Sequence, residues 1–259
     1  MIYEINSLSF SYPGSKRQVL NDISFCVAKG EVHSILGPNG AGKSTLLGCM
    51  MGLLRYNSGS VLLNEREVRN LSPRDIASLC GYVPQLHQPT FEYTVIEFVL
   101  MGLASSMGLF GKPGAKEYAV ATEALQALGI SNLAEQPYTR ISGGERQKAS
   151  IARAIAAKPL VVLFDEPTAH LDYGSQGVVL KLIKSVAEMG YAVISTTHNP
   201  DHALLLGGQA ALLDKDGVLV YGPATDIITA ENLSRIYECE VHLEYIPSLK
   251  RHVCIYAKL

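Results

Sequence analysis

The sequence predicts an α/β fold with a parallel sheet, an N-terminal antiparallel β subdomain and an inserted α-helical subdomain. Apolar strand patterns at 31–37, 160–165 and 191–198 alternate with helical patterns, which favours parallel strands joined by crossover helices. Residues 1–30 instead alternate apolar and polar positions around a Pro-Gly turn, as antiparallel strands do. From about 94 to 157 helical patterns dominate, which indicates a helical insert.

The elements before the insert are bounded by clear signals. Ser72 is the expected N-cap of a short helix, with Pro73 at its first position, and Pro84 stops the strand that follows. The expected elements are antiparallel strands within 1–30, a strand at 31–37, a helix at 43–54, a strand at 59–68, a helix at 72–80 and a strand at 81–85.

Capping and glycine signals also delimit the later elements. Thr94 and Glu97 form a capping-box pattern, and Gly129 closes an amphipathic helix. Asp216 and Gly217 lie between a last pair of strands. The expected elements are helices at 94–102, 116–130, 145–157 and 174–190, strands at 160–165 and 191–198, and two strands around a turn at 241–259. We expect this tail to cover a sheet edge, and it has no predicted chemical role.

Composition excludes several classes of protein. The chain has 259 residues, 47% hydrophobic and 18% charged, with a net charge of -2, so it offers no basic face for a nucleic-acid backbone. Its apolar runs are far shorter than the roughly 20 residues of a membrane span, and its start lacks a signal-peptide pattern. We therefore expect a soluble, cytoplasmic chain. The five cysteines show no metal-type spacing, and we expect them to be small buried hydrophobes: Cys26, Cys49, Cys80, Cys239 and Cys254.

A phosphate-binding loop is the most specific motif. The stretch "GPNGAGKST" matches G-x-x-x-x-G-K-[ST], follows an apolar strand and opens a helix, which is the context that the motif requires. Its glycines allow a tight loop of inward-pointing N–H groups, its lysine adds positive charge at the β and γ phosphates, and its serine hydroxyl suits Mg²⁺. The candidate phosphate ligands are Gly37, Asn39, Gly40, Ala41, Gly42, Lys43, Ser44 and Thr45, with Ser44 also a metal ligand.

Polar residues end three other apolar strands. Asp165 emerges at the carboxyl end of "LVVLF", where ligands of open α/β sheets bind, and is expected to hold Mg²⁺ through water. Glu166 follows it and is expected to reach an attacking water. Gln85 ends "GYVPQ" as a neutral amide for Mg²⁺ or water, and His198 ends "YAVISTTH". The sequence therefore predicts a site for a nucleotide and a metal at this edge of the sheet.

The stretch "ISGGERQ" at 141–147 is a second glycine-rich helix start, and two interpretations are open. Free N–H groups of Gly143 and Gly144 would bind an anion at a helix N-terminus. Alternatively, Ser142 and Glu145 form a capping box that serves only the helix. Capping does not require two glycines, each of which costs backbone entropy.

Taken together, these motifs resemble the nucleotide-binding subunit of ABC transporters, over nearly the whole chain and in the family's order. The resemblance implies a P-loop NTPase core of the ABC type that binds and hydrolyses ATP with Mg²⁺. It also implies that Tyr12 in "SFSYPG" stacks on adenine, that Glu166 is the catalytic carboxylate and that His198 contacts the γ-phosphate and orients water. Asp172 in "TAHLD" would couple the two nucleotide sites of a dimer.

The resemblance further implies partners. Ser142, Gly143 and Gly144 would close over ATP held by a second copy, in a head-to-tail dimer with ATP between the chains. The segment after Gln85, with the helical insert, would dock on two membrane permease subunits at the cytoplasmic face of the membrane, and a substrate-binding protein would act indirectly. No nucleic-acid partner is expected. The implied organisation is one domain, with 1–93 and 158–235 as the ATP-binding core, 94–157 as the helical signature subdomain and 236–259 as a C-terminal β extension.

Departures from the family pattern leave the phosphate ligands intact. Ile141 and Glu145 replace the usual Leu and Gln of the family's signature, "LSGGQ". The family's usual "SALD" is here "AHLD", with Ala169 and His170, and Asn199 replaces the usual Asp after the histidine. We therefore expect active hydrolysis.

Three stretches, "TVIEFVLMGL", "TAHLD" and "DIITAENLSRIYECEV", resemble the subgroup of importers for iron-siderophore, haem, cobalamin and related metal-chelate or oxyanion uptake. The alternatives are an export ATPase of the same fold and a non-transport mechanical ATPase acting on nucleic acid or ribosomes.

Overall fold

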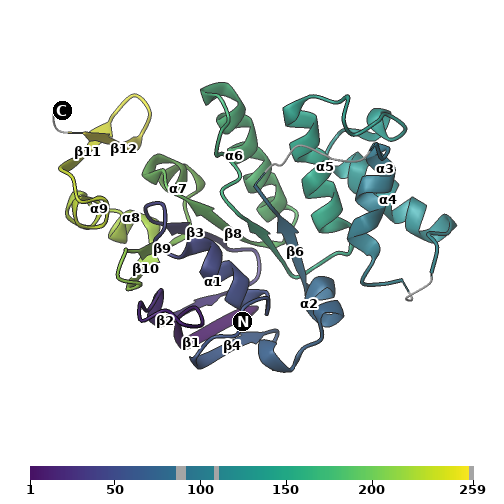
Figure 1. The fold of residues 1–259 in the computed structure, drawn as a ribbon. Coiled ribbons are helices and arrows are strands. Elements are labelled where there is room, and N and C mark those ends of the chain that lie inside the picture. The colour runs from purple at the N-terminus through teal and green to yellow at the C-terminus, as the bar shows by residue number, and fades with distance from the viewer. Residues whose placement is uncertain (86–91, 108–110, 257–259) are drawn as a thin grey trace.

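The computed structural model describes residues 1–85, 92–107 and 111–256 (Figure 1). Within these residues, the central sheet has the strand order β10-β9-β3-β8-β7-β6. Every neighbouring pair is parallel except β9 and β10, which form an antiparallel hairpin around Asp216 and Gly217, so the predicted α/β fold is confirmed. The strands are β3 (Val32–Leu36), β6 (Cys80–Val83), β7 (Val161–Phe164), β8 (Ala192–Thr197), β9 (Gln209–Leu213) and β10 (Leu219–Pro223).

A separate antiparallel sheet, in the order β2-β1-β4-β5, contains the N-terminal strands, as predicted. The prediction of one strand at 59–68 was wrong. Asn64 and Glu65 have left-handed backbone angles, φ 50° and 64°, and turn the chain into a hairpin. The strands are β1 (Tyr3–Phe10), β2 (Leu20–Val27), β4 (Ser58–Leu63) and β5 (Arg66–Glu67).

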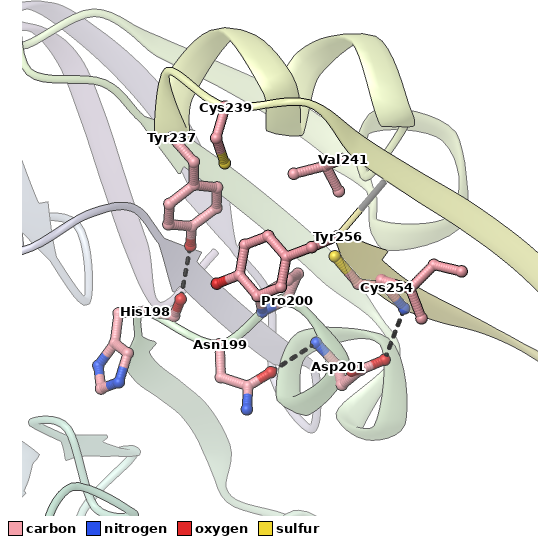
Figure 2. Close-up of a pocket in the computed structure, with 10 residues that line it drawn as sticks. His198, Asn199, Pro200, Asp201, Tyr237, Cys239, Val241, Cys254 and Tyr256 are labelled. Carbon is pink, nitrogen blue, oxygen red and sulfur yellow. Dashed lines mark hydrogen bonds between the residues drawn. The ribbon is translucent and has the colours of Figure 1, made fainter. Parts of the chain in front are cut away.

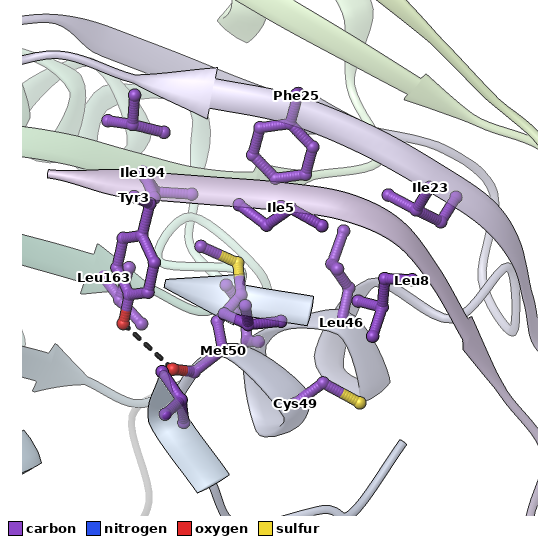
Figure 3. Packing of buried hydrophobic residues seen from close by; sticks show 14 of the residues in the cluster. Tyr3, Ile5, Leu8, Ile23, Phe25, Leu46, Cys49, Met50, Leu163 and Ile194 are labelled. Atoms are coloured by element: carbon purple, nitrogen blue, oxygen red, sulfur yellow. Dashed lines mark hydrogen bonds between the residues drawn. The ribbon is translucent and has the colours of Figure 1, made fainter. Parts of the chain in front are cut away.

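Helix α1 (Lys43–Met50) packs between the two sheets and forms the centre of one core (Figure 3). Leu46 and Met50 meet the N-terminal sheet on one side and the central sheet on the other, and the buried Tyr3 hydroxyl donates to the Met50 carbonyl at 3.0 Å. The helix is shorter than the predicted 43–54 because Gly52 takes a left-handed conformation, φ 67°. This packing holds the start of α1, and with it the phosphate loop, against the central sheet.

The helical insert lies beyond β6, and its helices pack on one another around a second core (Figure 1). Ser72 and Thr94 both cap their helices, as predicted, and in the structure Ser72 also forms a complete capping box with Asp75, as Thr94 does with Glu97. The helices up to the end of the insert are η1 (Val68–Asn70), α2 (Pro73–Leu79), α3 (Val95–Leu100), η2 (Met101–Leu103), α4 (Ala115–Ala127), η3 (Ser131–Leu133) and α5 (Gly143–Ala156). Helix α6 (Tyr173–Glu188) contacts α5 and covers the same face of the sheet. The predicted docking segment begins at 86–91, which lie outside the described residues.

The C-terminal region lies at the opposite end of the molecule from the insert (Figure 1). It contains helices that the sequence analysis missed, which have only four to eight residues: α7 (Pro200–Leu206), α8 (Ala224–Ile227) and α9 (Ala230–Tyr237). The tail forms the predicted hairpin of β11 (Val241–Ile246) and β12 (Arg251–Tyr256). The expectation that it covers a sheet edge was wrong, because the hairpin packs on α7 and α9 instead.

Two further expectations concern the cysteines and the membrane. Cys49 and Cys80 are buried, as expected, but Cys26 and Cys254 are half-buried and Cys239 is exposed, so the expectation was wrong for these three. Burial raises the pKa of the Cys49 thiol to about 12, which makes it unreactive. In the described ranges no helix combines the length and the apolar character that crossing a bilayer requires.

Candidate functional site

The carboxyl ends of four adjacent parallel strands form the candidate site. The loops after β3, β8, β7 and β6 carry the phosphate loop, His198, the Asp165–Glu166 pair and Gln85, in that spatial order. Gly40 and Gly42 take left-handed angles, φ 80° and 107°, which only glycine adopts without strain. Gly42 caps α1 without a side chain, so the first N–H groups of the helix remain available to a phosphate.

Lys43 is buried, with 5% of its side chain exposed, and its ammonium group has three partners. It donates to the carbonyls of Gly37 and Pro38 at 2.9 and 3.1 Å, and it pairs with Glu166 Oε1 at 3.0 Å. A cavity of about 420 Å³ opens beside it, lined by Tyr12, Ser15, Arg17, Val19, Asn39, Gly40, Gly42, Lys43, Ser44, Thr45 and Glu166. An anionic ligand in this cavity would compete with Glu166 for the lysine charge.

The oxygen atoms around Asp165 fit a magnesium ion. Ser44 Oγ donates to Asp165 Oδ1 at 3.1 Å, Thr196 Oγ1 donates to the same oxygen at 2.8 Å, and the Tyr82 hydroxyl donates to Oδ2 at 3.3 Å. The described residues contain no cluster of three or more His, Cys, Asp or Glu side chains suited to a metal. A single carboxylate, that of Asp165, with the hydroxyl of Ser44 beside it nevertheless matches Mg²⁺, which binds through one or two carboxylates and takes its remaining ligands from phosphates and water.

Gln85 follows β6 at the same edge of the sheet, as predicted, and is half-buried. It is absent from the described lining of the phosphate-loop cavity. Its predicted role as a metal ligand therefore stays a prediction.

Glu166 contacts His198 as well as Lys43. His198 Nδ1 lies 3.2 Å from Glu166 Oε2. Burial opposes ionisation of Glu166, but the hydrogen bond and charge of Lys43, helped by His198, more than offset it, so the pKa of Glu166 is lowered. The residue also has a left-handed φ of 44°, held by its N–H donating to Thr196 Oγ1 at 2.8 Å. Strained backbone of this kind in a non-glycine residue concentrates at functional sites.

Tyr12 stands at the mouth of the cavity. Its hydroxyl lies 3.0 Å from Thr45 Oγ1, its ring packs edge-on against Phe10, and 46% of the residue is exposed. A flat ligand has access to this ring. Arg17, whose Nη2 donates to the Lys215 carbonyl at 2.8 Å, lines the same cavity.

Sequence reasoning missed several residues of this site. Ser15, Arg17 and Val19, which follow the stretch "SFSYPG", line the cavity and were not predicted. Tyr82 and Thr196 were not predicted either, although they lie within the stretches "GYVPQ" and "STTH". A polar residue inside an apolar strand was the available signal for Thr196.

The signature stretch, "ISGGERQ" at 141–147, lies away from the phosphate loop. The structure confirms the capping box: Ser142 Oγ accepts from the Glu145 N–H at 3.3 Å, and the Glu145 carboxylate accepts from the Ser142 N–H at 2.8 Å. Yet a Cβ atom built on Gly143 or Gly144 would meet nothing within 4 Å. Capping therefore explains the serine and the glutamate but not the two glycines.

A second cavity, of about 470 Å³, lies beside the signature stretch and contains Asp172. Its lining is Ser142, Gly143, Gly144, Gln147, His170, Leu171, Asp172, Ser175, Val178, Val179 and Leu182, and in the described residues it shares none with the phosphate-loop cavity. Asp172 caps α6 by accepting from Ser175, and these hydrogen bonds lower its pKa. One chain therefore does not bring Ser142, Gly143 or Gly144 to Lys43.

Comparison with known proteins gives a consistent result. The family model described as ABC transporter matches residues 20–169. The molybdate import ATP-binding protein MolC of Haemophilus influenzae is 34% identical, over 90% of this chain and 87% of that protein. The iron(3+)-hydroxamate import ATP-binding protein FhuC of Bacillus subtilis is 30% identical, over 97% and 95%. A solved chain from an inward-facing ABC transporter, described as metal-chelate type, superposes with a TM-score of 0.87 at 31% identity, over 99% and 98%.

Proposed function

Because this chain belongs to the ABC transporter family, as the ATP-binding and ATP-hydrolysing subunit of an importer, we propose that it energises uptake of a metal chelate or an oxyanion. The similar proteins carry molybdate and iron(3+)-hydroxamate in their names, which supports this cargo class. The observation that carries the ATP-driven part of the proposal is the convergence of Lys43, Asp165 and Glu166 beside a cavity at one edge of the sheet.

In the proposed binding mode, the N–H groups from Gly37 to Thr45 hold the phosphates of ATP. Lys43 exchanges its contact with Glu166 for the β and γ phosphates, and the exposed face of Tyr12 stacks on adenine. Ser44 and Asp165 would hold Mg²⁺, with Gln85 as a further ligand, and this ion supplies positive charge to the β and γ oxygens.

Hydrolysis then depends on Glu166 and His198. Once Lys43 has turned to the phosphates, Glu166 is free to accept a proton from a water molecule whose oxygen attacks the γ-phosphorus. The bond between that phosphorus and the bridging oxygen breaks, ADP leaves with the electron pair, and inorganic phosphate forms. Before that exchange, the hydrogen bond and charge of Lys43 lower the pKa of Glu166, so its carboxylate enters the reaction without a proton, as a proton acceptor must. His198, in contact with Glu166, orients the water and the γ-phosphate.

A second copy completes the site in this proposal. Subunits of this family dimerise and work with permease subunits, and the separation of the two cavities supports a head-to-tail arrangement. The open space over Gly143 and Gly144 lets the phosphates of ATP on the partner approach their N–H groups, and Asp172 lies in the same cavity to couple the two sites. ATP then joins the two chains, and hydrolysis releases them.

We also propose a location, membrane partners and a division of the chain into subdomains. The chain works at the cytoplasmic face of the membrane, peripheral to two permease subunits that receive cargo from a substrate-binding protein. The net charge of -2 supports the absence of a nucleic-acid partner. The division into an ATP-binding core at 1–93 and 158–235, a signature subdomain at 94–157 and an extension at 236–259 follows the same proposal.

The variant Ser142→Arg tests the shared site. It should bind ATP as tightly as the wild-type chain, because Lys43 lies in the other cavity, but fail to dimerise and fail to hydrolyse. The matched control is Ser131→Arg, the same change at an exposed serine of the insert, which should hydrolyse normally. Equilibrium binding of a fluorescent ATP analogue, light scattering with ATP and phosphate release are the measurements. Normal hydrolysis by Ser142→Arg would refute the shared site.

A further inference from the structure

The loop that carries His198 is held by the C-terminal extension, of which the structure describes residues 236–256. The Tyr237 hydroxyl, at the end of α9, donates to the backbone carbonyl of His198 at 2.6 Å. Figure 2 shows this bond and shows that the imidazole of His198 points away from the neighbouring cavity while the carbonyl faces Tyr237. The bond therefore acts on the backbone of the residue and leaves the imidazole for Glu166.

The position of His198 in the chain explains why its carbonyl uses an external partner. The strand ladder ends at Thr197, whose carbonyl accepts from Gly37 N–H at 3.3 Å, and helix α7 begins its ladder at the Asn199 carbonyl, which accepts from His202. His198 is the single residue between these two ladders, so neither of them holds its carbonyl. The N–H of the same peptide, on Asn199, donates to Thr197 Oγ1 at 3.1 Å, and the Tyr237 hydroxyl holds the carbonyl on the other side.

Tyr237 is a well-anchored donor. Leu233 and Ile236 of α9 belong to a buried cluster that also contains Val241, and Tyr237 packs against the same cluster. Burial raises the pKa of Tyr237 above its ordinary value, so the phenol is protonated at neutral pH and can donate.

A second attachment holds the hairpin to the helix that follows His198. The Cys254 N–H donates to Asp201 Oδ1 at 3.1 Å, and Arg251 lies 3.7 Å from the same oxygen. Asp201 N–H in turn donates to the Asn199 side chain, which caps α7 (Figure 2). A cavity of about 260 Å³ lies between the two attachments, so Tyr237 and Asp201 are separate points of support.

We propose that Tyr237 is a positioning residue for hydrolysis: its hydroxyl fixes the peptide after His198 and thereby aims the imidazole at Glu166. The relay is short, because His198 Nδ1 lies 3.2 Å from Glu166 Oε2. The C-terminal extension thus acts on the catalytic pair without touching ATP. This inference rests on the proposed roles of His198 and Glu166.

A double-mutant cycle between Tyr237→Phe and His198→Ala tests the inference. Phe keeps the ring and removes only the hydroxyl, so kcat for ATP hydrolysis should fall by about 10-fold, as expected for a misaimed catalytic group, with little change in KM for ATP. In the His198→Ala background the same change should cost nothing further, because the group that it aims is gone. The matched control is Tyr245→Phe, an exposed tyrosine of the same extension, which should leave kcat unchanged.

Three results of this cycle would overturn the positioning role of Tyr237. A wild-type kcat for Tyr237→Phe, or an equal loss in both backgrounds, overturns the inference, since an equal loss is what a merely structural role produces. A wild-type kcat for His198→Ala overturns the proposed role of His198 and the inference with it. If Tyr237→Phe does not fold, as judged by thermal unfolding, Asp201→Ala replaces it in the cycle: it releases the second attachment and should give the same pattern with a smaller loss.

Discussion

The contact between Lys43 and Glu166 makes Glu166→Gln the most informative substitution in this protein. Loss of the proton acceptor should lower kcat by about 10²–10⁴-fold, which corresponds to about 2.7–5.4 kcal/mol of activation free energy. The substitution keeps the shape of the side chain and removes only its charge, so folding should be little affected.

The same substitution should tighten ATP binding. Glu166 pairs with Lys43 at 3.0 Å, with 20% and 5% of the two side chains exposed, and this pair competes with the phosphates. A hydrogen bond between charged groups contributes about 1 kcal/mol more than the neutral one that Gln would keep. Removing that competition should lower the Kd of a single chain for ATP by roughly 5-fold.

Three measurements check this prediction: steady-state phosphate release, equilibrium ATP binding without Mg²⁺, and light scattering with ATP and Mg²⁺, where the variant should stay a dimer. The matched control is Glu123→Gln. It neutralises the glutamate of another Lys–Glu pair, with Lys158 at 3.1 Å, but there both side chains are about two-thirds exposed. Such a pair contributes only about 0–1 kcal/mol, so the control should resemble the wild-type chain. Wild-type hydrolysis by Glu166→Gln, or a variant that stays monomeric with ATP and Mg²⁺, would refute the assignment.

Three further predictions follow from the structure. Chelation of Mg²⁺ by EDTA, or the substitution Asp165→Asn, should abolish phosphate release while ATP analogue binding persists; hydrolysis without the metal would contradict the predicted site. Gly102→Ala should lower the free energy of unfolding in urea by about 1–3 kcal/mol, because its Cβ would lie 2.0 Å from the Arg153 carbonyl, whereas Gly177→Ala, in open space within α6, should not. Since the pKa of Glu166 is lowered on folding, its contribution to stability is complete above the ordinary carboxyl pKa and is lost as the pH falls from there through the lowered pKa. Unfolding free energies measured across this window should therefore decline less for Glu166→Gln.

Local signals predicted much of the fold. The capping boxes at Ser72, Thr94 and Ser142 are complete in the structure, because a capping box is made by residues three apart and needs no distant partner. The strands β3, β7 and β8 were likewise predicted from their apolar runs. Where prediction failed, the missed element was short: the two-residue turn at Asn64 and Glu65, and the helices α7 to α9, which have four to eight residues.

The residues of the candidate site were predicted from motifs, but their contacts were not. The phosphate loop and the acidic pair that ends β7 are recognisable because phosphate and metal chemistry restrict which residues serve there. Their roles stay predictions until they are tested. Thr196, which holds both Asp165 and Glu166, gave no comparable signal, because a buried threonine is common in strands and its partners lie about thirty residues away.

The sequence by itself determined the identity of the phosphate loop, the caps of the helices and the order of the motifs, because these depend on residue type and short spacing. Only the tertiary structure decided that Lys43 pairs with Glu166, that the signature stretch lies in a different cavity from the phosphate loop, and that Tyr237 supports His198. The order of strands in the sheet and the packing of the C-terminal extension set these distances. Contacts between residues so far apart in the chain depend on how the whole core packs, which no local pattern encodes.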